Sequence, residues 1–265
     1  MPELPEVEAV CRRLRKQAAG ATLAAAHIER RRITSPQDPA RVESRLAGRT
    51  IERIGRRGKN ILVILSGGLA MRVHLRMTGN LYVIPDFRLR PARSSAWFEF
   101  TDGRGLLFED PRGLGALTVH DSPEIEGIGP EPLSREFTAE AFIRAAAASR
   151  RPAKLYLMDQ RRIAGLGNIY AAEALFTAGI HPGKPIGSVS RPRLAALHAA
   201  IVGILRDAVK SAVRAYSRPG GFQEAEEFMP AVYGREGDLC GRCGGVIRRI
   251  PQGGRSTYYC PKCQR

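Results

Sequence analysis

The chain has 265 residues, of which 43% are apolar, enough for a sizeable core and more than one domain usually needs. Its 42 Lys and Arg residues outnumber 26 Asp and Glu residues, giving a net charge of +16, which favours an anionic partner such as nucleic acid. An apolar run of about 18 residues and a basic-then-apolar leader are both missing, so we exclude a membrane or secreted protein and expect a soluble, cytoplasmic one.

The first predicted element is a helix over residues 5–17. Pro5 suits the first helical position, and Glu6 and Glu8 suit the positive end of the helix dipole. Basic residues gather toward the other end, where the dipole favours them. Cys11 lies on the apolar face of this helix, which predicts a buried core thiol.

Ahead of this helix stands Pro2, which is small enough for the initiator Met to be removed and leave a free secondary amine. An α-amino group has a pKa roughly two units below that of lysine, so more of it is free base at neutral pH. Attack on a sugar carbon would give a cationic iminium, with Glu3 as the adjacent proton donor and acceptor. Met-Pro-Glu is also an ordinary beginning of unrelated chains.

Residues 22–119 consist of short β-branched and aromatic runs separated by turn sequences such as Ser66-Gly67-Gly68. This pattern predicts an antiparallel sandwich or barrel with one helix in front of it. The candidate strands include Asn60–Leu65, Leu69–Leu75, Ala96–Thr101 and Gly105–Phe108.

A Pro/Gly-rich hinge over residues 127–133 ends the strand-rich part, and helix-period apolar faces follow it. Residues 217–238 have no clear periodicity and predict a mobile loop. The predicted helices are Ala139–Ser149, Leu155–Gln160, Ile169–Thr177 and Arg191–Val213.

The C-terminal segment carries a strong metal-binding pattern. Two C-x2-C pairs are separated by sixteen residues, a spacing that lets two turns present four thiolates to one structural zinc ion. A hairpin is predicted between the pairs, with Arg255 projecting from its turn either as a phosphate contact or as a solvated residue. The four predicted ligands are Cys240, Cys243, Cys260 and Cys263.

Several motifs occur together and in one order, and the chain thereby resembles the bacterial formamidopyrimidine-DNA glycosylase and endonuclease VIII family. The resemblance implies an α+β multidomain fold: an N-terminal antiparallel β-sandwich with flanking helices over 1–130, a helix-two-turn-helix domain over 131–220, a mobile loop over 221–238 and a β-hairpin zinc finger over 239–265. The motifs are Pro2-Glu3-Leu4-Pro5-Glu6-Val7-Glu8, Arg57-Gly-Lys59, His74-Leu-Arg-Met77-Thr-Gly79, Asp110-Pro-Arg112-Gly, Gly165-Leu-Gly-Asn168-Ile-Tyr170 and Gly254-Arg255-Ser-Thr-Tyr-Tyr-Cys260.

The resemblance also implies roles for individual residues. Pro2 is the expected nucleophile, Glu3 the proton shuttle, Lys59 a cation near the reacting sugar, and Arg255 a catalytic phosphate anchor. Met77 and Arg112 are expected to fill the space that a flipped nucleotide leaves, although a core Met and a surface Arg would look the same in sequence. Asn168, at a helix start, is either a phosphate ligand or an ordinary N-cap. Lys154 and Arg150 are further candidate phosphate ligands.

Three segments depart from the family pattern. Leu114 stands where the family usually has an aromatic residue, so it can wedge between bases but stacks poorly. Arg93-Ser94-Ser95 replaces a His-containing segment, which puts the histidine contact in doubt and leaves Arg93 as the candidate DNA-binding residue there. The sequence from Ser211 differs from the start of the family's loop that caps an oxidised purine, so formamidopyrimidines, oxidised pyrimidines or abasic sites are expected to be better substrates than 8-oxoguanine.

The predicted function is a bifunctional glycosylase and abasic-site lyase of base excision repair. It would remove oxidised bases, formamidopyrimidines before 8-oxoguanine, through a Pro2 iminium followed by β,δ-elimination. Two alternatives stay open: an endonuclease VIII-like enzyme for oxidised pyrimidines, which Leu4 disfavours, and a non-catalytic zinc-containing DNA-binding protein. The expected partner is damaged double-stranded DNA, with no membrane, and the expected state is a nucleoid-associated monomer.

Overall fold

The computed structural model describes residues 2–91, 94–216 and 228–265. Arg93, a predicted DNA contact, lies outside the described residues. Contacts divide the chain into two compact units: unit 1 comprises residues 1–126 and 212–225, and unit 2 comprises residues 127–211 and 226–265.

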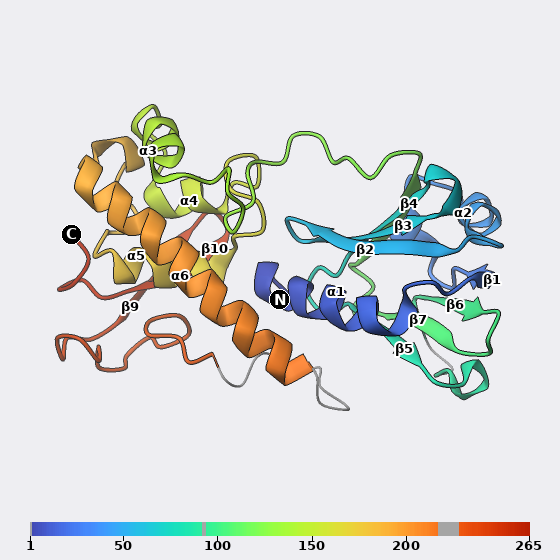
Figure 1. Cartoon of the computed structure of the whole chain (residues 1–265). Coiled ribbons are helices and arrows are strands. Elements are labelled where there is room, and N and C mark those ends of the chain that lie inside the picture. The colour runs from blue at the N-terminus through green and yellow to red at the C-terminus, as the bar shows by residue number, and fades with distance from the viewer. Residues whose placement is uncertain (1, 92–93, 217–227) are drawn as a thin grey trace. The chain divides into compact units, whose positions relative to one another are not determined.

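Unit 1 contains two four-stranded antiparallel sheets (Figure 1), so the predicted sandwich is confirmed. The four predicted strands all occur, with ends within one residue of the prediction. Across the first sheet the strands are β2 (Ile51–Arg57), β3 (Asn60–Leu65), β4 (Ala70–His74) and β8 (Ala116–His120). Across the second they are β1 (Leu23–His27), β6 (Ala96–Phe100), β7 (Gly105–Glu109) and β5 (Asn80–Ile84).

The core of unit 1 follows from the alternation of its strands. Buried and half-buried residues alternate along β6, the period-2 pattern of a strand with one face toward the core. Phe98, Phe100 and Phe108 are fully buried in this core. Fully buried aromatic side chains of this size supply a large part of the hydrophobic stabilisation of a domain.

Helix α1 (Leu4–Ala18) runs beside the sheets and contacts β2 of one and β5 of the other (Figure 1). A second helix, α2 (Pro39–Leu46), corrects the expectation of a single helix in this part of the chain. Asp38 accepts a hydrogen bond from the N–H of Arg41, and Pro39 takes the first helical position, which together start a helix. Short 3-10 helices are η1 (Arg31–Thr34), η2 (Ser66–Gly68) and η3 (Phe87–Leu89).

Unit 2 is mainly helical, as predicted, and ends in the expected hairpin. Its α4 begins two residues earlier than predicted, directly after Pro152. No described helix combines the length and apolar character that crossing a membrane requires. The elements are α3 (Ala139–Ala147), α4 (Ala153–Met158), α5 (Asn168–Thr177), η4 (Ile186–Ser188), α6 (Arg191–Tyr216), β9 (Arg248–Gln252) and β10 (Arg255–Tyr259). Residues 212–216 of α6 belong to unit 1.

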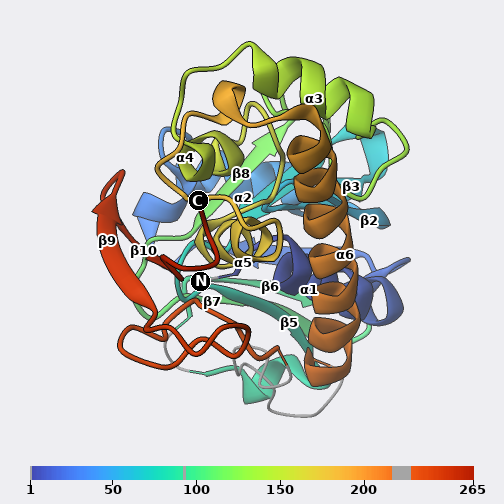
Figure 2. The same cartoon turned by 90° about the vertical axis from the view of Figure 1, so that its left-hand side faces the viewer.

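Helix α5 supports the cysteine-rich segment. It contacts α4 and β10 (Figure 2), and its Ala172 and Phe176 share a buried apolar cluster with Val232 and Ile247. Two of the cysteines, Cys240 and Cys260, belong to the same cluster. The hairpin is therefore held by packing against α5 as well as by its predicted metal site.

Candidate functional site

The start of α1 holds Pro2 and Glu3 in a fixed arrangement. Glu3 is the N-cap residue with an extended backbone, and its N–H donates to Glu6 Oε2 at 2.7 Å. This contact is half of a capping box, which satisfies an N–H that would otherwise lack a helical partner. Pro2 is buried, and Glu3 has 0% exposure. The predicted nucleophile and proton shuttle are thus adjacent on a rigid element.

Lys59 lies in the tight turn between β2 and β3, where a chain of contacts ties it to α1. Arg56 Nε donates to Glu8 Oε2 on α1 at 3.2 Å, and Arg56 Nη1 donates to the Gly58 carbonyl at 2.8 Å. Burial raises the pKa of Glu8, but the hydrogen bond from Arg12 and the charges of neighbouring arginines outweigh it, so the pKa lies below its ordinary value. The turn that carries Lys59 is therefore anchored to the helix that carries Pro2 and Glu3.

Met77, Arg112 and Leu114 lie on two loops that Asp110 joins. The Asp110 carboxylate accepts hydrogen bonds from the Thr78 hydroxyl group at 2.5 Å and from the Gly115 N–H at 2.6 Å. Asp110 is 2% exposed. Met77 and Leu114 are 42% and 41% exposed, and Arg112 is exposed. Two large apolar side chains left in solvent beside an arginine suit insertion into a base stack better than a role in the core.

The turn before Met77 is shaped by His74. Its Nδ1 accepts the N–H of Arg76 at 3.0 Å, and Arg76 has φ of 55°, a left-handed conformation that is uncommon outside glycine. A Cβ on Gly79 would lie 2.4 Å from the Leu75 carbonyl oxygen, so that position requires glycine. Burial, together with the charges of Arg76 and Lys59, lowers the pKa of His74 to about 4.

This lowered pKa predicts a pH dependence of stability. A histidine whose pKa falls from 6.5 to about 4 on folding binds more protons when unfolded, so the free energy of unfolding should rise by up to roughly 3 kcal/mol between pH 4 and 6.5. Chemical denaturation across this range measures the rise. His74→Asn, which keeps an acceptor but cannot titrate, should flatten it; an unchanged slope in the variant would assign the rise to other groups.

In unit 2, Lys154 and Asn168 both contact the Ser256 carbonyl at the start of β10. Lys154 Nζ donates to it at 3.0 Å and also contacts Thr257 Oγ1 at 2.5 Å, while Asn168 Nδ2 donates at 3.1 Å. Lys154 has 0% exposure, so its ammonium group faces the interior rather than solvent. The structure brings these two predicted residues together, directly beside Arg255.

The other two predicted phosphate contacts of unit 2 are on its surface. Arg255 is exposed and is the first residue of β10, paired with Gln252 across the Gly253–Gly254 turn. Both glycines have positive φ, which a two-residue hairpin turn of type I′ requires. Arg150 is exposed between α3 and α4. The long guanidinium side chains of both residues are available to an anion.

The four predicted zinc ligands come together at the base of the hairpin. Their sulfur atoms all lie within 4.8 Å of one another, with Cys240 and Cys263 at 3.9 Å and Cys243 and Cys260 at 3.5 Å. Tetrahedral zinc with Zn–S bonds of about 2.3 Å needs sulfur separations of ~3.8 Å. The geometry fits the metal, and these cysteines hold one structural zinc ion.

Zinc removal should unfold the hairpin and abolish DNA binding, because structural zinc commonly contributes about 10–16 kcal/mol to folding. Cys243→Ser should lower the zinc content, measured by elemental analysis, and raise the Kd for duplex DNA. Cys11→Ser is the matched control, since Cys11 is buried and donates to the Gly55 carbonyl. Full DNA affinity in zinc-free protein would contradict the expectation.

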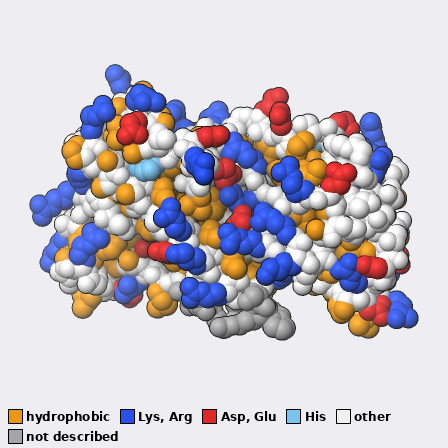
Figure 3. Space-filling model, viewed as in Figure 1, with side chains coloured by type: hydrophobic (Ala, Val, Ile, Leu, Met, Phe, Trp, Pro, Cys, Tyr) orange, Lys and Arg blue, Asp and Glu red, His pale blue; other side chains and the backbone are white. Residues whose placement is uncertain are grey.

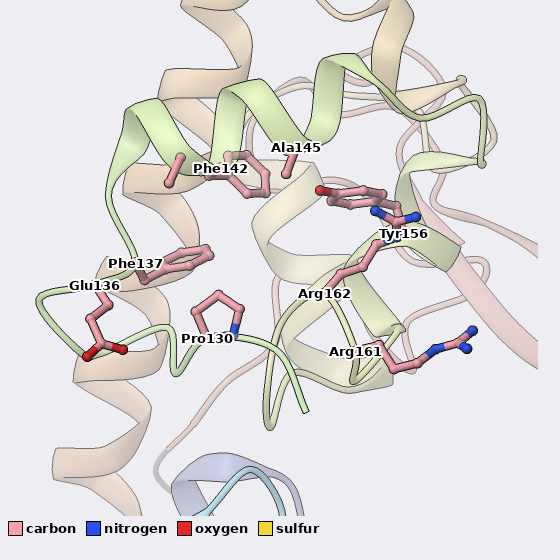
Figure 4. A pocket seen from close by; sticks show the side chains of 9 residues that line it. Pro130, Glu136, Phe137, Phe142, Ala145, Tyr156, Arg161 and Arg162 are labelled. Carbon is pink, nitrogen blue, oxygen red and sulfur yellow. The ribbon is translucent and has the colours of Figure 1, made fainter. Parts of the chain in front are cut away.

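Two further surface features lie outside the predicted residues: many cations and an apolar pocket. Lys and Arg side chains are spread over the face drawn in Figure 3. A pocket of about 300 Å³ in unit 2 is lined by the rings of Phe137, Phe142 and Tyr156, with Arg161 and Arg162 beside them (Figure 4). Its lining includes none of the predicted site residues, so it shares no side chain with the candidate site.

The sequence interpretation missed Asp110 and Glu173 as organising residues. Asp110 was noted only as part of a motif. Glu173 is 4% exposed and accepts the N–H groups of residues 231–233, so this part of the predicted mobile loop is held to α5. The available signal was that Glu173 is the one charged residue of an otherwise apolar helix, since buried charges need partners.

Three family models match consecutive parts of the chain. The Formamidopyrimidine-DNA glycosylase N-terminal domain matches residues 1–117, and the Formamidopyrimidine-DNA glycosylase H2TH domain matches residues 128–217. The model described as a zinc finger found in FPG and IleRS matches residues 237–265. The matched ranges include the sandwich up to the start of β8, the helices α3–α6 and the cysteine hairpin in turn.

Full-length relatives agree with these matches. The formamidopyrimidine-DNA glycosylase of Chloroflexus aggregans is 40% identical over 276 residues, covering 100% of this chain and 98% of that one. The Streptococcus pneumoniae enzyme is 36% identical over 274 residues, covering 100% and 99%. A solved complex of the Lactococcus lactis enzyme with abasic-site DNA superimposes with a TM-score of 0.90 at 31% identity, with both chains fully covered. The chain therefore belongs to the formamidopyrimidine-DNA glycosylase family.

Proposed function

We propose that this protein is a bifunctional DNA glycosylase and abasic-site lyase of base excision repair, acting as a single chain on damaged double-stranded DNA at the nucleoid. The observation that carries the proposal is the start of α1, where Pro2 adjoins Glu3 and the Glu3–Glu6 hydrogen bond fixes the backbone. A nucleophile and a proton donor held in one geometry are what displacement at a sugar carbon requires.

The reaction follows from the chemistry of a secondary amine. With Met1 removed, the Pro2 nitrogen attacks C1′ and loses its proton, and the damaged base leaves with the bonding electron pair and takes up a proton. Glu3 protonates the sugar ring oxygen so that the ring opens to an iminium. The cation accepts the electron pair released when C2′ loses a proton, and the 3′ phosphate leaves. Loss of a proton from C4′ then expels the 5′ phosphate, and water hydrolyses the iminium to regenerate Pro2.

Lys59 and Arg255 would stabilise negative charge on the groups that react, Lys59 near the sugar and Arg255 at the leaving phosphate. Lys59 supplies a positive charge near the sugar, in the turn that Arg56 and Glu8 anchor to α1. Arg255 binds the phosphate that leaves, through a guanidinium group that matches phosphate geometry.

Met77, Arg112 and Leu114 would fill the stack after the damaged nucleotide is flipped. Unstacking costs a few kcal/mol, which inserted side chains offset. Met77 and Leu114 are apolar and exposed, and Arg112 can hydrogen-bond the orphaned base. Leucine lacks the ring that stacks on a base, so we propose relaxed discrimination of the opposite base.

Unit 2 would bind the phosphate backbone. Helix α5 begins after Gly167, which has no side chain to cap it, and the N–H groups at a helix start attract phosphate. Asn168 and the exposed Arg150 and Arg255 contribute to the same contact. Lys154 is buried and would support this contact indirectly, because its ammonium group donates to the Ser256 carbonyl next to Arg255.

The substrate proposal follows from the solved relatives and from one departure. The similar Lactococcus lactis enzyme was solved with abasic-site DNA, and a variant of it, at 32% identity and a TM-score of 0.90, with Fapy-dG-containing DNA. We place formamidopyrimidines first and 8-oxoguanine second, because the sequence from Ser211 onward departs from the family's lesion-capping loop.

The test is borohydride trapping of the purified protein on five duplexes: undamaged DNA and DNA with an abasic site, a formamidopyrimidine, 8-oxoguanine or an oxidised pyrimidine. Adducts on the abasic and formamidopyrimidine duplexes are expected, together with δ-elimination products on a gel. Strongest trapping on oxidised pyrimidines would instead favour an endonuclease VIII-like specificity. Binding without any adduct would favour the non-catalytic DNA-binding alternative.

A further inference from the structure

Glu173 forms an unusual set of contacts in the middle of α5. Its carboxylate accepts three successive backbone N–H groups, from Ala231 at 2.8 Å, Val232 at 3.0 Å and Tyr233 at 2.8 Å. The residue is 4% exposed, and burying a carboxylate is costly unless such donors surround it. This single side chain therefore fixes the backbone of residues 231–233 against α5.

The fixed segment places Tyr233 against two parts of the candidate site. Its hydroxyl oxygen lies 3.4 Å from Asn168 Nδ2, and its ring packs edge-on against Tyr258 of β10 with centroids 5.2 Å apart. Asn168 Nδ2 also donates to the Ser256 carbonyl at 3.1 Å. Tyr233 thus touches both the helix start that carries Asn168 and the strand that begins at Arg255.

Only the Nδ2 half of the Asn168 side-chain amide makes hydrogen bonds within the described residues. Nδ2 is used by Ser256 and Tyr233, while Oδ1 is buried and has no hydrogen-bond partner among the described residues. The orientation of this amide therefore depends on the two acceptors that Nδ2 meets. One of them, the Tyr233 hydroxyl, is held in place through the Glu173 carboxylate.

Glu173 is unsuited to chemistry on DNA, since it is buried and its oxygens already accept three N–H groups. We propose that Glu173 is a positioning residue: through Tyr233 it fixes the Asn168 amide, which holds the Ser256 carbonyl at the start of β10, and so it aligns the backbone N–H groups at the start of α5 and the Arg255 side chain with the DNA phosphates. This inference rests on the proposed function. It adds a residue that touches no DNA and yet determines how a helix start and an arginine side chain are presented to DNA.

The test measures the affinity for an abasic-site duplex as a function of salt. Each phosphate contact contributes about 0.9 to the slope of log K against log salt concentration. Glu173→Gln should weaken binding about 10-fold. It should also make the negative slope shallower, reducing its magnitude by about 1. Loss of stability alone reduces the amount of active protein but leaves the slope unchanged. Glu140→Gln, the same charge change on the surface of α3, is the matched control.

A double-mutant cycle tests whether the effect passes through Asn168. If it does, Glu173→Gln combined with Asn168→Ala should bind no more weakly than Asn168→Ala alone. Additive losses would overturn the inference, as would a wild-type slope in Glu173→Gln. Tyr233→Phe, which removes only the hydroxyl group, should lower the slope in the same direction and serves if Glu173→Gln does not fold.

The failure of this inference is distinguishable from the failure of the proposed function. Wild-type protein that traps abasic-site DNA, beside a Glu173→Gln variant with the same affinity and slope, would overturn only the positioning role. Wild-type protein that forms no adduct would overturn the proposed function itself. Zinc content of one ion per chain in each variant shows that the hairpin is intact.

Discussion

Replacing Pro2 with glycine is expected to lower the yield of borohydride-trapped adduct on an abasic-site duplex by about 100-fold or more, the size of effect that misplacing a reacting group produces. Glycine leaves a primary amine that no ring orients, at the end of a chain that α1 otherwise holds rigid. Its imine can also lose an N–H proton, which removes the cationic electron sink needed for elimination. Gel quantification of the adduct at equal enzyme concentrations measures the loss.

Pro39→Gly is the matched control for this change, because Pro39 opens α2 in the same unit and belongs to no predicted site. It should trap DNA as the wild-type protein does. If Pro2→Gly forms as much adduct as the wild-type protein, another amine must be the nucleophile. Peptide mapping of the reduced adduct would identify that residue.

Glu3→Gln is expected to separate base removal from lyase chemistry. Excision of a formamidopyrimidine should fall by about 10²–10⁴-fold, the usual contribution of a general acid, because the glutamine amide cannot deliver the proton that the sugar ring oxygen needs. A ready-made abasic site has no base to expel and is already in equilibrium with its ring-opened aldehyde, so trapping on that duplex should change much less. Single-turnover rates on the two substrates measure the split.

Glu52→Gln, an exposed residue of β2, controls for the loss of a negative charge from unit 1. An equal loss on both substrates in Glu3→Gln would indicate that Glu3 acts by fixing the position of Pro2 at the helix start. A thermal unfolding midpoint equal to that of the wild-type protein is needed for either interpretation.

Local sequence patterns predicted most of the helices and strands, because the spacing of apolar residues and the turn residues within a short window determine these elements. The β-branched run Asn60–Leu65 was predicted to the residue, and the spacing of the cysteines sufficed for the zinc site. Helix α2 was missed because it is short and buries only Val42 and Leu46, too few apolar positions to reveal a helical period.

The organisation of the site depended on contacts that no local window contains. Lys154 meets Ser256 across 102 residues of sequence, and Glu173 meets Tyr233 across 60. From sequence, Lys154 was a candidate phosphate ligand, whereas its ammonium group is buried and contacts Ser256 and Thr257 of the hairpin. The resemblance to a family identified which residues matter but not whether each faces DNA or supports one that does.

The loop that carries Arg112 and Leu114 is located by Asp110, which binds Gly115 on one side and the Met77 turn through Thr78 on the other. Asp110 therefore fixes the position of the loop independently of which side chain residue 114 carries. Residue 114 can exchange an aromatic ring for leucine without any rebuilding of the scaffold. If residue 114 has the role proposed above, preference for the opposite base would change by a single substitution, while the loop that carries Arg112 keeps its place.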